Sequence, residues 1–343
     1  MNIFSNIFNG LIKESSFLGV DLGSFSIKVA EISKDRKGGH LKLLAIAETK
    51  IIHNEQAKIT DDEKIKILSA LIKKANINSK KVIFSIENSF THYAIITLPI
   101  LKNNKVLDYI KLNFNDVLPV NFEDVHLEWR ILERGRGNMK VLLIAVNNDI
   151  IKRYKEIARI AKVDFYGYEI EATALANALI CETDKSEIVA LLDIRMKNSS
   201  LSLIKNMELI KSTGFGLSVN YFDANFKIAE EEKKREDKVS REQGTESLDS
   251  YFDLFYKKFW LSIVGLKKEE KQQLKKIIIS GGADFIPELA RYLQKKINKK
   301  LPAVKVEIAN PFTNINIDQL STKPKKSRQF SNAIGAALRG FKK

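Results

Sequence analysis

The hydrophobic pattern of the chain begins with a short apolar run that ends at a carboxylate. Phe17, Leu18 and Val20 lead to Asp21, a polar turn with glycine and serine follows, and apolar positions then continue to Ile32. Two apolar runs joined by such a turn are typical of a β-hairpin. The pattern therefore predicts two strands, with Asp21 near the end of the first.

The same pattern returns in the second half of the chain. Residues 188–194 form another apolar run with a carboxylate, Asp193, near its end. A polar turn over residues 195–200 separates this run from two further apolar stretches, 201–204 and 208–211. A buried strand, a carboxylate, a polar turn and two more strands thus occur twice. This duplication predicts two related α/β units.

The remaining patterns complete both units. Thr60 and Glu63 have the spacing of a capping box, which predicts that a helix begins there. Helices rich in small residues are expected at 172–178 and 333–340, and their slim faces permit close packing on a neighbour. Further strands are expected at residues 41–51, 81–86 and 276–280, and Gly281 and Gly282 follow the last of them.

Residues 88–164 show a different order of predicted strands and helices. Three predicted strands, at 92–98, 125–131 and 140–146, alternate with helices that begin near residues 104 and 151. This arrangement predicts a small α+β unit inserted in the first of the two repeated units.

Composition and charge limit the classes of partner that the protein is expected to bind. The formal net charge of +15 suits nucleic acid, an acidic partner or an anionic membrane surface. Because no zinc-finger spacing, helix-turn-helix signature or aromatic and basic strand pair accompanies it, we expect no nucleic-acid partner. The single cysteine excludes an internal disulfide and is typical of a reducing cytoplasm. No apolar run approaches the roughly 18–20 residues of a membrane span, so we expect no transmembrane segment. Residues 1–13 are amphipathic and could dock on the protein, on a partner or on the membrane interface. Their few charges disfavour strong lipid binding, so packing is the favoured alternative.

The turn after Asp21 carries the first candidate chemistry. It offers several backbone N–H groups, the hydroxyls of Ser24 and Ser26, and the ammonium group of Lys28. Such a nest of N–H groups beside a cation can hold phosphate oxygens, and Asp21 could hold the accompanying Mg²⁺ through water. An ordinary hairpin with a polar turn explains the same residues.

The order of these parts resembles the actin-like ATPase fold, and within it the PilM family of type IV pilus assembly proteins, which is related to the cell-division protein FtsA. The matching stretches are LGVDLGSFSIKVAEI, the inserted unit with TLP at Pro99 and LP at Pro119, YEIEATALANAL, IISGGADFIPELARYL and AIGAALRG. The resemblance implies an α/β fold with two related domains around a nucleotide cleft. It divides the chain into a first domain (1–87 and 165–190), an inserted α+β subdomain (88–164) and a second domain (191–343) with a helical subdomain near 217–275.

The resemblance also implies ATP and Mg²⁺ as ligands and assigns their site. The first phosphate motif corresponds to Asp21, Gly23, Ser24, Ser26 and Lys28, the second to Asp193, Asn198 and Ser199, and the adenosine motif to Gly281 and Gly282. Asp21, through water, and Asp193 would hold the metal. No catalytic residue is assigned. We expect hydrolysis to be slow or absent, because the second turn shows no group that orients a water molecule.

One position departs from the family pattern. Arg195 stands directly after Asp-Ile, where the family usually has glycine, and Met196 and Lys197 follow it. A bulky side chain at a turn of close approach either blocks the phosphate, or its guanidinium replaces the lost contacts. The sequence leaves both alternatives open.

The function that the resemblance implies is that of a cytoplasmic scaffold held at the inner face of the membrane by its partners. It would bind ATP, capture the short cytoplasmic tail of PilN, and work with the other platform and motor proteins of the pilus that drives twitching motility; self-association stays open. One alternative is a small-molecule kinase of the actin and sugar-kinase superfamily. Such an enzyme needs a carboxylate that acts on the substrate in the cleft, and the sequence offers no candidate for it. Another is an FtsA-like membrane-tethered cytoskeletal protein, but such tethers carry their amphipathic helix at the C-terminus, and the amphipathic stretch here is at the N-terminus.

Overall fold

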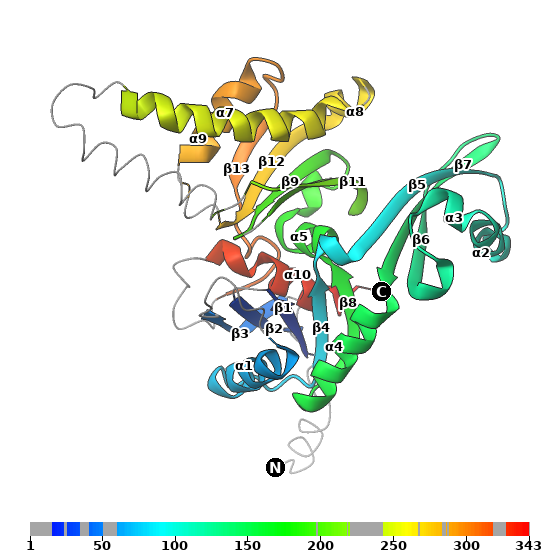
Figure 1. The fold of residues 1–343 in the computed structure, drawn as a ribbon, viewed down its shortest axis with the longest axis vertical. Coiled ribbons are helices and arrows are strands. Elements are labelled where there is room, and N and C mark those ends of the chain that lie inside the picture. The colour runs from blue at the N-terminus through cyan, green and yellow to red at the C-terminus, as the bar shows by residue number, and fades with distance from the viewer. Residues whose placement is uncertain are drawn as a thin grey trace, which may run out of the picture.

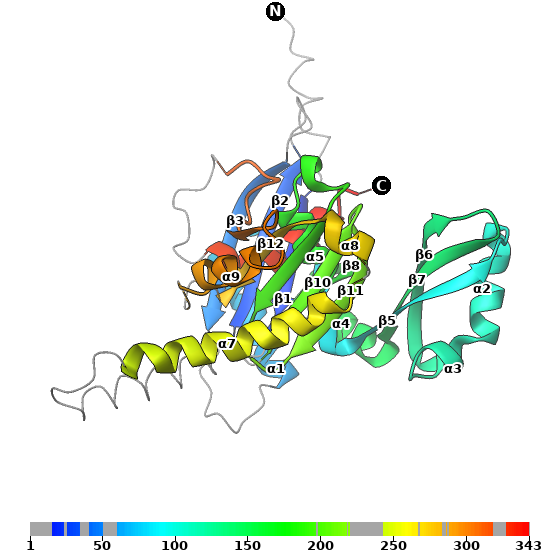
Figure 2. The same cartoon turned by 90° about the horizontal axis from the view of Figure 1, so that it is seen from above.

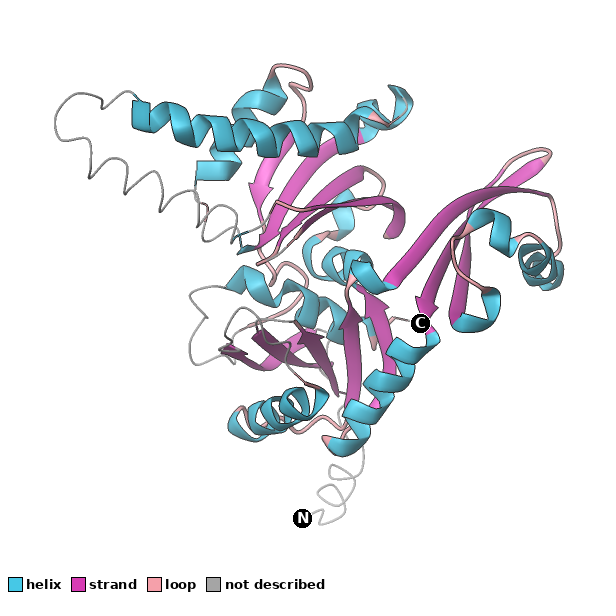
Figure 3. Cartoon of the chain, in the orientation of Figure 1, coloured by secondary structure: helices cyan, strands magenta, loops and turns pink. Residues whose placement is uncertain are grey.

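The structure of the chain is a computed structural model, drawn in Figure 1 and by secondary structure in Figure 3. It describes residues 16–23, 26–34, 41–50, 60–196, 198–217, 219, 243–266, 268–282, 286, 288–317 and 327–342. The amphipathic residues 1–13, Ser24 of the first turn and Lys197 of the second lie outside the described residues.

Five strands form the first sheet in the order β3-β2-β1-β4-β8. These strands are β1 (Ser16–Leu22), β2 (Ser26–Lys34), β3 (Leu41–Lys50), β4 (Lys81–Ile86) and β8 (Asp164–Ile170). The predicted hairpin is confirmed, since β1 pairs antiparallel with β2 and parallel with β4. Nearly all side chains of β1 and β4 are buried because these strands lie at the centre of the sheet.

The second sheet repeats this topology in the order β11-β10-β9-β12-β13. Its strands are β9 (Ile188–Ile194), β10 (Ser199–Lys205), β11 (Glu208–Phe215), β12 (Leu274–Gly281) and β13 (Lys305–Ile308). As β1 does, β9 pairs antiparallel with the next strand and parallel with a later one. The predicted duplication is therefore confirmed, and Asp21 and Asp193 occupy equivalent positions, one residue before the end of the equivalent strands.

Two helices rich in small residues, α5 (Glu171–Leu179) and α10 (Ser331–Arg339), lie between the two sheets (Figure 1). A Cβ on Gly335 would lie 1.7 Å from the carbonyl oxygen of Ala174, and a Cβ on Gly19 would lie 1.8 Å from that of Ala333. The predicted close approach is thus confirmed on both sides of α10. Because α10 packs on β1, the last helix lies with the first sheet, although we assigned residues 191–343 to the second domain.

The outer faces of the sheets are covered by other helices. The first sheet carries α1 (Asp61–Lys74) and α4 (Asn148–Ile160), while the second carries α7 (Gln243–Val264) and α9 (Glu288–Asn298), with the short α8 (Lys268–Gln273) leading into β12. The predicted capping box begins α1. The Thr60 N–H donates to Glu63 Oε2 at 2.8 Å, and the Glu63 N–H donates to Thr60 Oγ1 at 3.3 Å.

The inserted unit has its own sheet, in the order β5-β7-β6, and its own core. Its elements are β5 (Thr91–Pro99), α2 (Asn103–Leu112), α3 (Phe114–Val117), β6 (Val125–Arg134) and β7 (Asn138–Asn147). Figure 2 shows this unit standing beside the two stacked sheets. Helix α4, which we placed in the insertion, instead buries Ile151, Tyr154 and Ile157 in the core of the first sheet. Helix α2 buries Val106 and Ile110 in the core of the unit, whereas Leu107 on the same helix is 36% exposed.

Two side chains join the insertion to the second sheet. The Tyr93 hydroxyl of β5 donates to the carbonyl oxygen of Ser212 on β11. The Arg130 guanidinium of β6 donates to Glu208 Oε1 at 2.8 Å, at the start of the same strand. Within the described part of the chain, no helix is long and apolar enough to span a membrane.

Candidate functional site

A cleft of about 940 Å³ opens where the two sheets face each other. It is lined by the ends of β1, β4, β9 and β12 and by the first residues of α5 and α10. Every predicted site residue that the structure describes lines this one cleft. These residues are Asp21, Gly23, Ser26, Lys28, Asp193, Asn198, Ser199, Gly281 and Gly282. The duplicated strand ends come together here because the two sheets share one topology and lie on either side of the same pair of helices.

The predicted phosphate cation, Lys28, lies in a row of charged residues across three strands. In the strand register Lys28 stands opposite Asp21 on one side and opposite Glu48 on the other. Its ammonium group donates to the Ser26 hydroxyl and lies 3.8 Å from Glu48 Oε1. Lys28 therefore has a carboxylate opposite it on each neighbouring strand, and these pairs of opposite charge place its ammonium group at the wall of the cleft.

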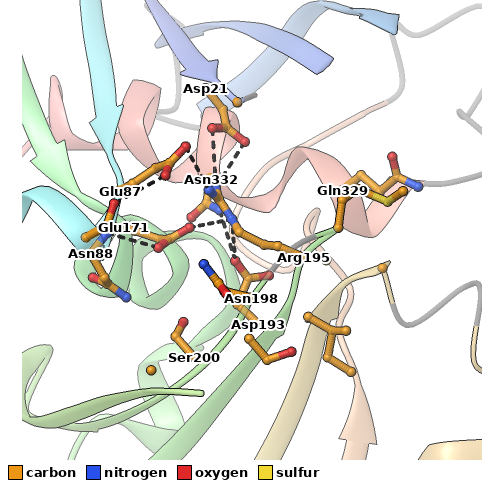
Figure 4. A pocket seen from close by; sticks show the side chains of 18 of the residues that line it. Asp21, Glu87, Asn88, Glu171, Asp193, Arg195, Asn198, Ser200, Gln329 and Asn332 are labelled. Atoms are coloured by element: carbon orange, nitrogen blue, oxygen red, sulfur yellow. Dashed lines mark hydrogen bonds and ion pairs between the residues drawn. The ribbon is translucent and has the colours of Figure 1, made fainter. Parts of the chain in front are cut away.

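Arg195 occupies the centre of the cleft and contacts carboxylates from both halves of the molecule (Figure 4). Its Nε lies 2.6 Å from Glu171 Oε1 and 3.2 Å from Asp193 Oδ2. Its Nη2 lies 3.3 Å from Asp21 Oδ1, and its Nη1 lies 3.6 Å from Glu87 Oε1. We call Arg195 and these four carboxylates the Arg195 cluster.

Burial sets the protonation of the Arg195 cluster. Burial raises the pKa of Glu171 to about 8, and although Arg195 opposes this rise, the nearby carboxylates of Asp193, Glu87 and Asp21 reinforce it. Burial alone would lower the pKa of Arg195, but the four carboxylates, Glu171 first, raise it well above its ordinary value. Arg195 therefore stays charged, and since one guanidinium does not balance four carboxylates, Glu171 keeps a proton near neutral pH.

The sequence analysis assigned no role in the cleft to Glu87, Glu171 or Asn332. Glu87 directly follows β4, much as Asp21 and Asp193 lie near the ends of their strands, so an apolar run followed by an acid was the signal available in the sequence. Glu171 is the first residue of α5 and lines the cleft, whereas Glu169, near the end of β8, contacts Thr173 and Arg339. Asn332 had no such signal, because only the return of α10 to the first sheet brings it to the cleft.

Unpartnered polar atoms face this space. The buried Asn332 side chain, 4% exposed, has a long contact of 3.4 Å from Nδ2 to Asp193 Oδ2, and its Oδ1 has no hydrogen-bond partner among the residues that the structure describes. Within the same residues, the Asn88 side-chain nitrogen is also buried without a partner. Buried polar atoms are costly to leave unpaired, so these atoms are suited to a polar ligand. The first turns of α5 and α10 add backbone N–H groups, which favour an anion.

Glycine is required at position 281 for a structural reason that does not involve a ligand. Its φ is +72°, and a Cβ there would lie 2.4 Å from Asp193 Oδ1 and 2.4 Å from the Ile194 carbonyl oxygen. Glycine is therefore required for β12 to end beside β9. Its lack of a side chain also leaves the backbone open to the cleft.

The residues present do not fit the predicted Mg²⁺ site. Mg²⁺ needs about six oxygen ligands in octahedral geometry, drawn from carboxylates and water. Here both assigned carboxylates, Asp21 and Asp193, are ion-paired with Arg195, whose guanidinium stands between them. Among the residues that the structure describes, no group of three or more His, Cys, Asp or Glu side chains is arranged to hold a metal ion.

A family model described as type IV pilus assembly protein PilM matches residues 19–341. The chain belongs to the PilM family. The match includes both sheets, the insertion and the cleft, so the pilus-assembly hypothesis is favoured over a kinase or an FtsA-like tether.

Solved structures agree with a PilM family fold. A PilM–PilN type IV pilus biogenesis complex aligns with a TM-score of 0.66 and 18% identity, covering 96% of this chain and 100% of that chain. MreB 5 of Spiroplasma citri bound to AMPPNP aligns with a TM-score of 0.54 and 11% identity, over 94% and 95% of the two chains. The ethanolamine utilization protein EutJ from Carboxydothermus hydrogenoformans aligns with a TM-score of 0.50 and 12% identity, over 95% and 90%. The predicted actin-like ATPase fold is confirmed.

Proposed function

We propose that the protein is a scaffold of the type IV pilus assembly complex that binds ATP in its cleft and captures the cytoplasmic tail of PilN. The observation that carries this proposal is the family match, which runs through residues 19–341 and therefore through both sheets and the insertion. We also propose a cytoplasmic location at the inner face of the membrane, reached through the tail of PilN. Contacts with other platform and motor proteins, or with a second copy of the chain, belong to this proposal as well.

The cleft supports the nucleotide part of the proposal. Its volume of about 940 Å³ is at the upper end of the roughly 300–1,000 Å³ of small-molecule sites. Lys28 and Arg195 supply positive charge, the helix starts supply N–H groups, and Asn332 supplies an unpartnered oxygen. A solved relative of the same fold, MreB 5, is bound to AMPPNP. We leave Mg²⁺ out of the proposal because its predicted ligands are paired with Arg195.

Hydrolysis is expected to be slow for a related reason. An attacking water molecule must be oriented by a carboxylate or a similar group. Four of the carboxylates that line the cleft, those of Asp21, Glu87, Glu171 and Asp193, contact Arg195, and that of Glu48 lies 3.8 Å from the Lys28 ammonium group. The nucleotide then stabilises one shape of the protein without rapid turnover.

The insertion supports the partner part of the proposal. Among the described strands, none pairs with the outer edges of β5 and β6 in its sheet, and Ile95 on β5 is 37% exposed. An extended peptide can pair with such an edge and place alternate side chains on the sheet. The groove would lie between the insertion and the first domain. Thr91 and Tyr93 of β5 also line the cleft, so one strand connects the two proposed sites.

Binding of a labelled peptide tests this function. The peptide carries the cytoplasmic tail of the PilN protein from the same organism, and fluorescence anisotropy follows its binding to the full chain with and without ATP. We expect saturable binding that a scrambled peptide does not reproduce. Equal binding of the scrambled peptide, or no binding in either condition, would contradict the partner assignment.

A further inference from the structure

The Arg195 cluster brings carboxylates from both domains around one permanent cation. Asp21 and Glu87 come from the first sheet, Glu171 from α5, and Asp193 from the second sheet. All four lie within 3.6 Å of a guanidinium nitrogen, and three of them are less than 5% exposed, Asp21 at 4%, Glu171 at 3% and Asp193 at 1%. The arrangement is a set of inward-facing carboxylates around one central positive charge.

Charge balance explains why this position needs a cation. Carboxylates crowded in a partly dry cleft repel one another and would also repel the phosphates of a nucleotide. A divalent ion relieves this repulsion only if it can reach the oxygen atoms directly. Arg195 already occupies the space between Asp21 and Asp193, and its own charge repels a second cation. The guanidinium is planar and presents five N–H donors, so it can contact several carboxylates at once.

We propose that Arg195 takes the place of the divalent cation in this cleft, so that ATP binds without Mg²⁺ and the wild-type cleft has no metal site of its own. The inference rests on the proposed function where it concerns ATP, but the exclusion of metal does not depend on nucleotide. Removing the guanidinium leaves Asp21 and Asp193 without the cation between them, and a divalent ion can then bind in its place.

The first experiment measures Mn²⁺ binding to the full chain without nucleotide, by the loss of the free-ion EPR signal. The proteins are wild type, Arg195→Gln, and the control Arg130→Gln, which removes an arginine from a pair with Glu208 outside the cleft. We expect no specific binding to wild type or to the control. Arg195→Gln is expected to bind one Mn²⁺ at least about a hundredfold more tightly, because a repelling charge a few ångströms away is gone. Equal affinities in wild type and Arg195→Gln, whether strong or weak, would overturn the inference.

The second experiment needs only wild-type protein and therefore stands even if Arg195→Gln does not fold. ATP affinity is measured by calorimetry in excess EDTA and in excess Mg²⁺. We expect the two dissociation constants to agree within about threefold, and a loss of tenfold or more in EDTA would overturn the inference. If ATP binds in neither buffer, the nucleotide part of the proposed function fails. In that case wild-type Mn²⁺ binding still decides whether Arg195 excludes a metal.

Discussion

The Nε of Arg195 lies 2.6 Å from Oε1 of Glu171, and this contact connects the turn after β9 to the first residue of α5. The same guanidinium reaches Asp21 at the end of β1. One side chain thus joins the second sheet, the central helices and the first sheet. Both the stability of the closed cleft and its ligand chemistry are expected to depend on it.

Replacing Arg195 by glutamine is expected to lower the free energy of unfolding by about 3–5 kcal/mol, because the buried carboxylates of Asp21 and Asp193 lose the guanidinium that contacts them. Urea unfolding at neutral pH measures this loss. Arg291→Gln is the matched control. Arg291 pairs with Glu288 at 3.0 Å, but the two side chains are 85% and 61% exposed, so the expected loss there is about 0–1 kcal/mol. Similar losses in both variants would contradict the account.

Glu171 is expected to make stability fall as pH rises. Its pKa in the folded protein, about 8, is above its ordinary value, so the folded state keeps a proton that the unfolded state releases. Stability should therefore decrease between about pH 4.5 and pH 8, with a contribution of at most about 1.4 kcal/mol per pH unit from this group. Glu171→Gln should flatten that part of the curve. Burial also raises the pKa of Glu169, but that group is present in both proteins, so unchanged slopes would contradict the assignment.

Gly335→Ala is expected to destabilise the layer of helices between the sheets. The new methyl group would lie 1.7 Å from the Ala174 carbonyl oxygen, and both backbones would have to move apart. Overpacking typically lowers the free energy of unfolding by about 1–3 kcal/mol. Because this clash involves two backbones, we expect a loss at or above the upper end of that range. Gly167→Ala on β8 is the control, since its Cβ would meet no atom within 4 Å. Thermal unfolding that ranks the two variants equally would contradict this packing.

Removing the insertion is expected to abolish capture of the PilN tail and to preserve nucleotide binding. Thr91 pairs with Val146 across β5 and β7, so the chain ends left by deleting residues 92–145 are neighbours that a short Gly-Ser turn can join. This deletion keeps α4 and β8, which belong to the core and the sheet of the first domain. Anisotropy with the tail peptide measures the loss, and circular dichroism checks the fold. Unchanged peptide affinity in the folded variant would place the partner groove elsewhere.

The repeated sheets were predicted closely because a local pattern of apolar residues marks each strand. The runs at 81–86 and 188–194 match β4 and β9 residue for residue, and the Thr60–Glu63 box is formed as expected. The return of α10 to the first sheet was harder to predict. Small residues mark its close packing, but which sheet receives it is a long-range property of the fold.

The cleft was only partly predictable for the same reason. Asp21 and Asp193 follow a local pattern of apolar strand and acid, and Glu87 follows it as well but stood outside the motifs that the resemblance supplied. The role of Arg195 depends on side chains up to 174 positions away in sequence. Sequence alone left two alternatives for Arg195, and the contacts of its guanidinium with four carboxylates could not be read from either of them.

The central claim is that the cleft between the two sheets binds ATP, and a thermal unfolding series on the full chain tests it most directly. The protein is heated with increasing ATP in excess EDTA, beside Lys28→Ala, which removes a cation from the cleft wall. At about a hundredfold excess over its dissociation constant, ATP should add about 2.7 kcal/mol and raise the wild-type midpoint by roughly 5 °C, because it binds only the folded state. Lys28→Ala should show a clearly smaller shift at the same ATP concentrations. If ATP leaves the wild-type midpoint unchanged in both EDTA and Mg²⁺, the cleft is not a nucleotide site and the account is contradicted.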